Sequence, residues 1–131
     1  MEVSGQFDKL LKAAKEASLN AYAPYSGYKV GAALLCGDGT VFTGCNVENA
    51  SYSLTICAER NAVFQAVNAG FRDFVAIAIY VDDNKLFPPC GACRQVLAEF
   101  NPAMEVLYAN RAQSCRSNLE SLLPQAFTLK S

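Results

Sequence analysis

Apolar and polar residues recur along this chain with two different periods, and each period predicts one kind of secondary structure. Between Phe7 and Ala21 the apolar residues are three or four positions apart, which is typical of a helix with one buried face. Pro24 and Gly27 interrupt that spacing directly afterwards. We therefore expect an N-terminal helix over residues 7–21 that ends before a turn.

Three apolar runs predict strands in the first two thirds of the chain. Residues 29–36 and 40–47 indicate two strands, and Asp38 followed by Gly39 favours a tight turn that makes them antiparallel neighbours. Residues 73–81, with the sequence DFVAIAIYV, form an almost unbroken apolar run. Such a run is typical of a strand that is buried on both faces in the middle of a sheet.

The remaining segments predict two more helices and two more strands. A second helix is expected over about residues 58–69, closed by Gly70, and a third from residue 91 or 92 to residue 100. Residues 104–110 and 113–119 predict the last two strands, before a turn in the sequence LLPQAF. The order helix, hairpin, helix, strand, helix, strand, strand predicts an α/β fold, with a mixed sheet of about five strands covered by helices.

Length and charge narrow the class of protein. The 131 residues contain no linker or internal repeat, so we expect a single domain over residues 1–131. With a net charge of −1 and a pI near 5.4, the chain lacks the positive field that polynucleotide binding needs, so small molecules are the expected partners.

Residues 1–17 offer no continuous apolar run for a signal peptide or a membrane span, which predicts a cytoplasmic protein without membrane contact. Apolar residues make up 52% and charged residues 18%, which favours a homo-oligomer that covers part of its apolar surface.

Six cysteines in a chain without an export signal predict reduced thiols rather than three disulfides. Cys57 precedes the second expected helix, and Cys90 and Cys93 lie at the start of the third. Unpaired backbone amides and the helix dipole lower the pKa of a thiol at such positions, and the thiolate is the form that binds zinc. Both helices follow strand ends at one edge of the expected sheet, where ligands of such sheets usually bind. The three thiols are therefore candidate ligands of one zinc ion.

Glu59 and Arg60 complete a candidate catalytic group beside these thiols. Three protein ligands leave a fourth position on zinc for a water, which becomes hydroxide near neutral pH. Glu59 lies two residues after Cys57, so it can take a proton from that water and deliver it to a substrate nitrogen and then to a leaving amine. Arg60 can hydrogen-bond thiolate sulfurs and offset part of their excess negative charge. These roles meet the needs of hydrolytic deamination.

Two short motifs and three longer stretches resemble one enzyme family. The motifs are CAE at residues 57–59 and PCGAC at residues 89–93, which match the zinc deaminase signature in its three-cysteine form. The stretches YAPYSGYKVGAALL, GCNVENASYS and LLPQAF are similar to the small homotetrameric cytidine deaminases. The resemblance implies a three-layer fold in which helices flank a five-stranded mixed sheet. It also implies one zinc per chain, attack of zinc-bound hydroxide on C4 of cytidine or deoxycytidine, proton transfer by Glu59, release of ammonia, and a place in pyrimidine salvage.

The same resemblance implies a set of substrate-binding residues. Asn46 and Glu48 are expected to hold the ribose, chiefly its 3′-hydroxyl. A carboxylate there would repel a 5′-phosphate, so nucleosides should be preferred to nucleotides. Tyr28 matches a position where the family often has Phe, and it is expected to cover the pyrimidine ring. The other implied contacts are Tyr52, which frames the ribose, Ala58, and Phe127, which reaches the site of a neighbouring subunit in a homotetramer.

Other interpretations of the same residues stay open at this point. The CGAC of residues 90–93 differs by one residue from a thioredoxin-type redox pair, although Cys57 and Glu59 then have no role. A closed structural zinc needs a fourth ligand, for which the candidates are Cys36, Cys45 and Cys115. Blasticidin deaminases share the CAE and PCGxC elements, and the stretch NVENASYS is what favours a nucleoside. Taken one by one, the polar candidates could be ordinary solvated residues and the aromatic ones core residues.

Overall fold

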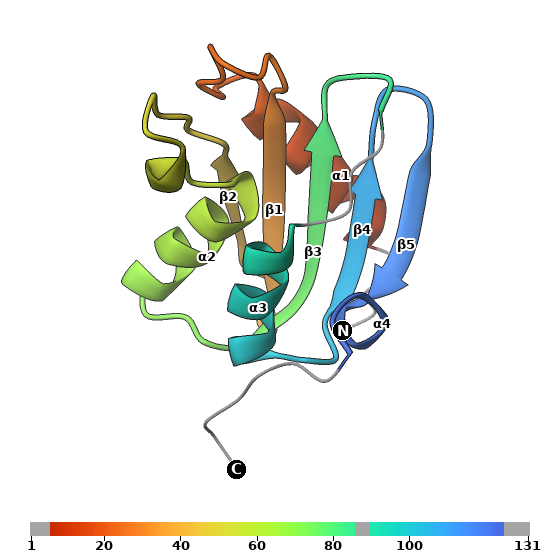
Figure 1. Cartoon of the computed structure of the whole chain (residues 1–131). Helices are drawn as coiled ribbons and strands as arrows, with labels where there is room; N and C mark the ends of the chain where they lie inside the picture. Colours follow the sequence, from red (N-terminus) through yellow and green to blue (C-terminus); the bar gives the residue numbers. More distant parts are fainter. Residues whose placement is uncertain (1–5, 86–89, 125–131) are drawn as a thin grey trace.

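Five strands form one mixed sheet in the computed structural model, which describes residues 6–85 and 90–124 (Figure 1). The strands are β1 (Val30–Cys36), β2 (Val41–Cys45), β3 (Phe74–Val81), β4 (Glu105–Ala109) and β5 (Ser114–Asn118). They lie in the order β2-β1-β3-β4-β5, with β3 and β4 parallel and the other neighbours antiparallel. The predicted hairpin, the five-stranded mixed sheet and the α/β class are confirmed.

The predicted central strand, β3, lies in the middle of this sheet. Every residue of β3 except Val75 is buried. Ile77 and Ile79 belong to the core on one face of the sheet, whereas Ala76 and Ala78 belong to the core on the other. Burial on both faces explains why no polar residue interrupts the strand.

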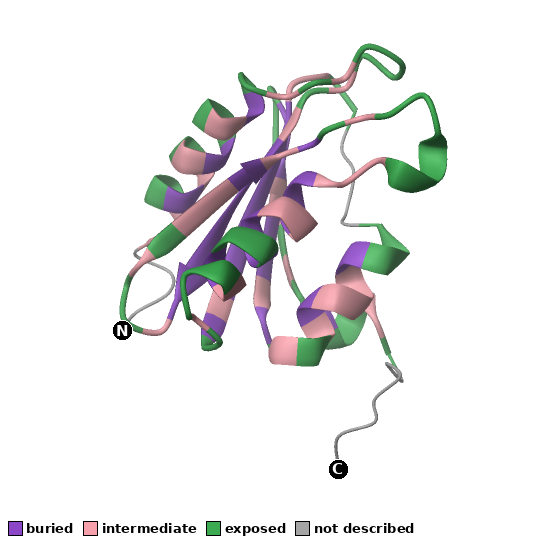
Figure 2. Cartoon of the chain, turned by 90° about the vertical axis from the view of Figure 1, so that its left-hand side faces the viewer, coloured by how far each residue is buried: buried purple, intermediate pink, exposed green. Residues whose placement is uncertain are grey.

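Helices cover both faces of the sheet and make it the middle one of three layers. They are α1 (Phe7–Ser18), α2 (Ala58–Asn68), α3 (Gly91–Phe100) and the short α4 (Leu119–Leu122), with a 3-10 turn, η2 (Tyr52–Leu54), before α2. α1 packs on one face through Leu10 and Ala14, and α2 and α3 pack on the other through Val63 and Leu97. In Figure 2 the buried residues follow the sheet and the inward sides of the helices. Among the described helices, none is long and apolar enough to cross a membrane.

Helix α1 ends at Ser18, three residues before the expected end at Ala21. The next three backbone N–H groups donate to carbonyls three residues back, which tightens the last turn. The N–H of Tyr22 then donates to the carbonyl of Asn46 at 3.0 Å. The chain leaves the helix because this long-range contact draws it toward the loop after β2. The other predicted helices and strands agree with the observed ones to within one or two residues.

The short helix α4 has no counterpart among the predicted elements. Asn118 caps it, because its side chain accepts a hydrogen bond from the N–H of Ser121 at 2.9 Å. A helix of about one turn leaves too little periodicity to be recognised in a sequence.

Gly44 lets α2 approach β2 closely. A Cβ at this position would lie 2.5 Å from the Ala62 nitrogen and 2.6 Å from the Ala58 carbonyl oxygen. Both are backbone atoms, so a larger residue could be accommodated only by moving the helix. The first turn of α2, which begins directly after Cys57, is therefore held against the strand.

Strands β2 and β3 run in the same direction because each is antiparallel to β1, which lies between them. Their carboxyl ends therefore lie at one edge of the sheet. From these ends the chain continues to the N-termini of α2 and α3. Cys57 is the N-cap of α2 and Cys90 is the N-cap of α3, so the topology brings both to this edge.

Candidate active site

The three predicted thiol ligands lie together at the sheet edge. The sulfurs of Cys57 and Cys90 are 3.7 Å apart, those of Cys90 and Cys93 are 3.2 Å apart, and all three lie within 4.8 Å of one another. Thiolates about 2.3 Å from a tetrahedral zinc are separated by about 3.8 Å, so the cluster has the size that zinc requires. Residues 6–85 and 90–124 contain no other group of three side chains that could hold a metal.

No fourth side chain joins this cluster in the described part of the chain. Cys36 is buried at the end of β1, Cys45 ends β2 and Cys115 lies on β5. None of these three cysteines is grouped with the cluster. A closed structural zinc therefore lacks its fourth ligand among the described residues, and an open catalytic position fits the donor set better.

Hydrogen bonds between the thiols favour a thiolate at Cys57. A hydrogen bond with Cys93, followed by others with Arg60 and Cys90, lowers the pKa of Cys57 to about 5 in spite of its burial. The same bond with Cys57, together with burial, raises the pKa of Cys93. The N–H of Cys93 also donates to the Cys90 sulfur at 3.4 Å, which caps α3. The cluster thus contains one thiol that ionises readily, in the form that binds a metal.

Arg60 turns back along α2 toward the thiols. Its Nη2 lies 3.5 Å from the Cys57 sulfur and 3.4 Å from the Thr55 carbonyl oxygen. The hydrogen bond to Cys57 raises the pKa of Arg60. Its Nε is buried and has no hydrogen-bond partner among the described residues. A guanidinium in this place offsets part of the thiolate charge.

Glu59 is buried in the first turn of α2, with 5% of its surface exposed. Burial raises its pKa to about 7, and the charge of Cys57 adds to the increase. A hydrogen bond from Cys93 and the charge of Arg60 oppose it. A carboxyl group with a pKa near 7 can both accept and release a proton at neutral pH.

A cavity of about 250 Å³ opens beside Cys57 and Glu59. Besides Cys57, five of the predicted site residues line it, namely Asn46, Glu48, Tyr52, Ala58 and Glu59. The fold therefore brings the expected ribose-binding residues and the expected proton carrier to one cavity. A cavity of this kind, with few convergent polar groups and a group of shifted pKa, is typical of a small-molecule site.

Other residues that line the cavity were not predicted. Val30, Ile79 and Val81 supply its apolar wall, and Ser26 contributes a hydroxyl group. The alternation along β3 could have indicated Ile79 and Val81, because residues two apart share one face of a strand. Ser26 has no comparable signal, since its contact with Glu48 spans 22 residues of sequence.

Asn46 lines the cavity and also holds the chain before β1. It is 8% exposed. Its side-chain oxygen accepts from the N–H of Val30 at 2.9 Å, and its Nδ2 donates to the carbonyl of Tyr28 at 2.8 Å. The second hydrogen on Nδ2 stays available for a ligand.

Glu48 holds the neighbouring turn through its carboxylate. Oε1 accepts from the N–H groups of Tyr25 at 2.9 Å and of Ser26 at 3.1 Å, and Oε2 accepts from the Ser26 hydroxyl. These bonds, with the Ser26 side chain contributing most, lower the pKa of Glu48. Glu48 is therefore an ionised acceptor in the cavity lining.

The three predicted aromatic contacts differ in where the structure places them. Tyr52 lies in η2 at the rim of the cavity and is 88% exposed. Tyr28 is half-buried and is not among the lining residues; its hydroxyl accepts from Nζ of Lys85 at 3.0 Å. Phe127 lies outside the described residues. The roles of Tyr28 at the pyrimidine and of Phe127 at a neighbouring site stay predictions.

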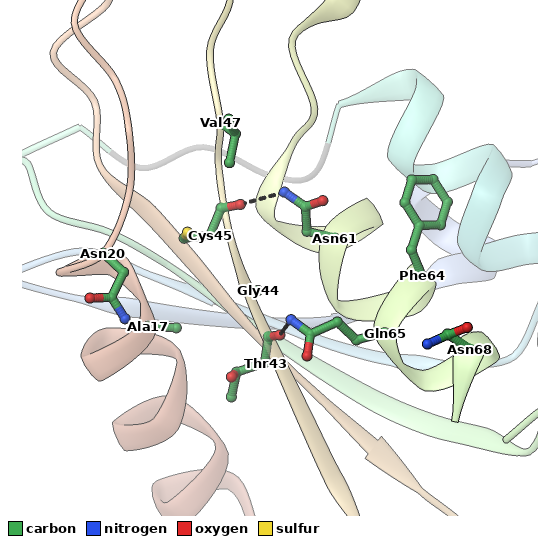
Figure 3. A pocket seen from close by; sticks show the side chains of 10 residues that line it. All are labelled: Ala17, Asn20, Thr43, Gly44, Cys45, Val47, Asn61, Phe64, Gln65 and Asn68. Carbon is green, nitrogen blue, oxygen red and sulfur yellow. Dashed lines mark hydrogen bonds between the residues drawn. The ribbon is translucent and has the colours of Figure 1, made fainter. Parts of the chain in front are cut away.

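A larger hollow, of about 510 Å³, lies between the end of α1, β2 and α2 (Figure 3). Two side-chain amides that line this hollow donate hydrogen bonds to backbone carbonyls of β2, which is an edge strand of the sheet. Nδ2 of Asn61 donates to the carbonyl of Cys45 at 2.7 Å, and Nε2 of Gln65 donates to that of Thr43 at 2.8 Å. These amides satisfy carbonyls of the edge strand. The lining of the hollow does not include a pair of neighbouring titratable groups such as Cys57 and Glu59 in the smaller cavity.

The chain is similar to known proteins in both sequence and fold. A sequence model described as the cytidine and deoxycytidylate deaminase zinc-binding region matches residues 5–110. A cytidine deaminase of Halalkalibacterium halodurans is 52% identical over 121 residues, which are 91% of this chain and 92% of that protein. One of Sporosarcina psychrophila is 49% identical over 123 residues, covering 92% of this chain and 90% of that protein. The crystal structure of cytidine deaminase from Burkholderia pseudomallei is similar with a TM-score of 0.87 and 51% identity, over 92% of this chain and 98% of that one.

Proposed function

The chain belongs to the cytidine and deoxycytidylate deaminase family, and we propose that its thiol cluster and cavity catalyse zinc-dependent hydrolysis of cytidine and deoxycytidine to uridine and deoxyuridine, with release of ammonia. The observation that carries this proposal is the position of Glu59. A buried carboxyl group with a pKa of about 7 lies beside a zinc-sized cluster of thiols and lines a cavity. The reaction serves the salvage of pyrimidine nucleosides.

Cys57, Cys90 and Cys93 hold the zinc ion, one per chain. When bound, the ion supplies a water ligand that is acidic enough to act as the nucleophile near neutral pH. Arg60 offsets part of the thiolate charge through its hydrogen bond to Cys57. Without that compensation three thiolates would outweigh the charge of the ion and weaken its effect on water.

Glu59 moves protons between the water, the base and the departing amine. As a carboxylate it accepts a proton from the attacking water, and as an acid it donates that proton to the ring nitrogen of the base. It then takes the second proton of the added water and delivers it to the amine, which leaves as ammonia. A pKa of about 7 makes both protonation states accessible for these transfers.

Asn46 and Glu48 select a nucleoside by its ribose. The ionised Glu48 accepts a hydrogen bond from the 3′-hydroxyl, and Asn46 donates one through its remaining amide hydrogen. A nucleotide would bring a phosphate near the Glu48 carboxylate, which costs free energy that a nucleoside does not lose. Tyr52 frames the ribose from the rim, and Ala58, which also lines the cavity, contacts the substrate.

The active unit is proposed to be a homotetramer of this single-domain chain, with active sites shared between subunits. Large apolar side chains on η2 and α2 are exposed, including Tyr52, Leu54 and Phe64 at 88%, 62% and 49%. A neighbouring chain would cover them, and Phe127 of that chain would reach the cavity. Sedimentation should give about four times the 14.1 kDa of one chain. A monomer that is fully active would contradict the shared site.

The reducing cytoplasm is the proposed compartment. All six cysteines are free thiols, including Cys36, Cys45 and Cys115 outside the cluster. Three thiols that must stay reduced to hold zinc fit such a compartment.

The direct test is an ultraviolet assay of cytidine loss on purified protein whose zinc content is measured on the same sample. We expect about one zinc per chain, ammonia release in step with cytidine loss, and a loss of activity on chelation that zinc reverses. Less than about half a zinc per chain together with no ammonia release would contradict the proposal. Dithiol exchange that survives the chelator would favour the redox pair, and faster turnover of blasticidin S than of cytidine would favour the other deaminase branch.

A further inference from the structure

Ser26 lines the cavity but has no part in the proposed reaction. It lies in the turn before β1, 22 residues ahead of Glu48. Its hydroxyl donates to Oε2 of Glu48, and its Oγ accepts from the N–H of Tyr28 at 3.0 Å. A hydroxyl has a single hydrogen, so Ser26 cannot donate to a substrate while it holds the carboxylate. Its effect as a donor therefore passes through Glu48.

The backbone of Glu48 is fixed by contacts that do not involve its side chain. Its N–H donates to the carbonyl of Tyr22 at 2.8 Å, and the N–H of Tyr22 donates to the carbonyl of Asn46 at 3.0 Å. These bonds join residues 46–48 to the loop before β1. The freedom left to Glu48 is that of its side-chain torsions, and ordering such a side chain when a ligand binds costs free energy.

Three hydrogen bonds from the turn before β1 restrict that side chain. Oε1 accepts from the N–H groups of Tyr25 at 2.9 Å and of Ser26 at 3.1 Å, and Oε2 accepts from the Ser26 hydroxyl. The two bonds to Oε1 meet at one atom, so by themselves they let the carboxylate turn about that atom. The bond to Oε2 adds a second point of attachment and fixes the plane of the group.

The same bonds leave the carboxylate with one acceptor site. An ionised carboxylate has about four such sites, two on each oxygen. Two bonds occupy Oε1 and one occupies Oε2, so the remaining site belongs to the oxygen that the Ser26 hydroxyl holds. The Ser26 hydroxyl also contributes most to lowering the pKa of Glu48, which keeps the group an acceptor. Because Glu48 lines the cavity, this site is available to one hydroxyl of a ligand.

We propose that Ser26 is a positioning residue for sugar recognition, which holds Oε2 of Glu48 so that its remaining acceptor site meets the 3′-hydroxyl of the substrate. This inference rests on the proposed function, in which Glu48 accepts a hydrogen bond from that hydroxyl. Ser26 acts before the substrate arrives, by removing freedom that the Glu48 side chain would otherwise lose on binding. The sugar contact is the same in the ground state and the transition state, so its loss raises KM more than it lowers kcat.

The test compares the hydrolysis of cytidine with that of 3′-deoxycytidine by the zinc-loaded protein. Ser26→Ala should lower kcat/KM for cytidine about three- to tenfold, mainly through a higher KM, because Glu48 must then be ordered on binding. 3′-Deoxycytidine lacks the hydroxyl that Glu48 binds, so its kcat/KM should change less than about twofold. 2′-Deoxycytidine keeps the 3′-hydroxyl and should respond as cytidine does. A turn that is merely loosened would impair all three substrates alike.

Two further variants test whether the hydroxyl of Ser26 acts through Glu48. Ser26→Thr keeps a hydroxyl group that can make the same contacts, so it should retain most of the parent activity. In a Glu48→Ala background Ser26→Ala should add little, because no carboxylate is left to hold. Ser26 is exposed, so these replacements should leave the fold intact.

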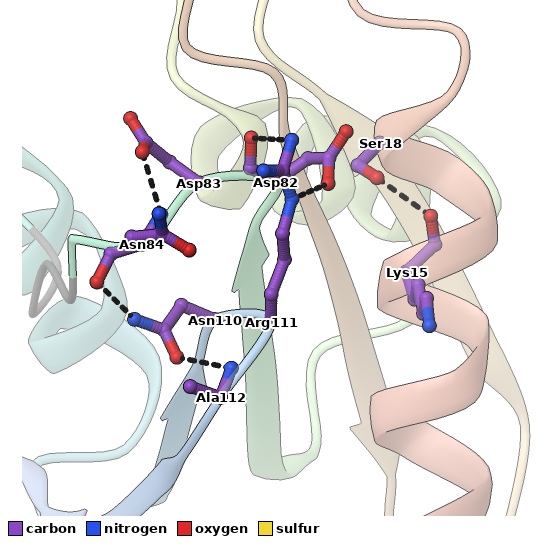
Figure 4. Close-up of polar contacts among 8 residues, drawn as sticks. All are labelled: Lys15, Ser18, Asp82, Asp83, Asn84, Asn110, Arg111 and Ala112. Atoms are coloured by element: carbon purple, nitrogen blue, oxygen red, sulfur yellow. Dashed lines mark hydrogen bonds and ion pairs between the residues drawn. The ribbon is translucent and has the colours of Figure 1, made fainter.

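Ser18→Ala is the matched control (Figure 4). The Ser18 hydroxyl also donates within the protein, but its acceptor is the Lys15 carbonyl of α1, at 2.6 Å. Ser18 is not among the residues that line the cavity. Its replacement should therefore leave the kinetics with cytidine and with 3′-deoxycytidine as in the parent.

Three results would each overturn the role of Ser26: an unchanged kcat/KM for cytidine in Ser26→Ala, an equal fall with cytidine and 3′-deoxycytidine, or a full further fall in the Glu48→Ala background. Any of these, with normal turnover of cytidine by the parent, leaves the proposed function standing. A parent protein that leaves cytidine unchanged overturns the proposed function, and the role of Ser26 with it.

Discussion

At the scale of single residues, the site places two ionisable groups in environments that shift their pKa values in opposite directions. Hydrogen bonds with its neighbours lower the pKa of Cys57 to about 5, while burial raises that of Glu59 to about 7. The two residues are only two positions apart, yet Cys57 accepts hydrogen bonds from its neighbours, whereas Glu59 is almost fully buried beside the cavity. Such a divergence is typical of sites that separate metal binding from proton transfer.

Replacing Glu59 by Gln should abolish turnover and leave the metal site intact. Gln has nearly the same shape and cannot accept the proton of the water, so kcat should fall by much more than 10²-fold. Zinc content, measured on the same sample, should stay at about one per chain because Glu59 is not a ligand. Turnover within tenfold of the parent would remove Glu59 from the mechanism.

The raised pKa of Glu59 also predicts a pH-dependent stability in protein stripped of metal by a chelator. Its pKa is about 7 in the folded chain and 4.5 unfolded. Because the pKa is higher in the folded chain, the contribution of Glu59 to the free energy of unfolding is fully present below pH 4.5. This contribution is lost as the pH rises through 7. When the pH is raised from about 4 to about 8, the free energy of unfolding of the parent should fall by about 2 to 3 kcal/mol more than that of Glu59→Gln.

Urea unfolding at several pH values measures this difference. The difference includes the interactions of Glu59 with Cys57 and Cys93, because these side chains are neighbours and their contributions are not independent. Parallel pH profiles for the parent and Glu59→Gln would contradict the assignment of a raised pKa to Glu59.

At the scale of elements, the site is built from helix N-termini that sheet packing holds in place. Cys57 and Cys90 cap α2 and α3, and neither helix position depends on the metal alone. Gly44 fixes α2 against β2, because backbone atoms of α2 lie where a Cβ would be. Asn61 and Gln65 reach from α2 to the carbonyls of β2 and strengthen the same contact.

Gly44→Ala should weaken both the fold and the metal site. The added methyl group would push the first turns of α2 away from β2, at a cost of about 1 to 3 kcal/mol in unfolding free energy. Zinc affinity should fall as well, because Cys57 moves with the helix. Gly91→Ala is the control, since a Cβ at Gly91 meets nothing within 4 Å. Equal stability and zinc affinity in the two variants would show that the close approach at Gly44 has no role.

At the scale of the whole molecule, the proposed zinc ligands come from segments that separate strands bring to the same edge of the sheet. Cys57 follows β2, and Cys90 and Cys93 follow β3, with β1 between these strands in the sheet. An ion bound by these three cysteines would connect α2 to α3 at this edge of the sheet. Ligand binding to the folded state alone stabilises it by mass action.

Removing zinc should therefore lower the thermal stability of the whole chain. At a free zinc concentration of about 1,000 times the Kd, zinc binding adds about 4 kcal/mol to the free energy of unfolding. A chelator should therefore lower Tm by more than about 10 °C. Differential scanning calorimetry with and without chelator measures the shift. Cys36→Ser, which changes a cysteine outside the cluster, should leave the size of the shift unchanged. A Tm that is the same with and without the chelator would show that the metal does not stabilise the folded chain.

The sequence by itself determined the features that depend on near neighbours in the chain. The helix before Ser18, the hairpin at Gly39 and the apolar run of β3 follow from periodicity and turn residues. Cys57 and Cys90 could be recognised as helix N-caps because a helix start is a local event. The direction of the strands then predicted that both thiols meet at one edge.

Only the tertiary structure decided the features that depend on strand register and packing. The distance of 3.7 Å between the Cys57 and Cys90 sulfurs depends on how α2 and α3 pack against the sheet, and so does the burial of Glu59. The contact of Lys85 with Tyr28 bridges 57 residues. No local pattern encodes such contacts, because each depends on where two distant segments are placed by the whole core. For the same reason the sequence could name Glu59 as a proton carrier, whereas its pKa of about 7 follows from the burial that the fold imposes.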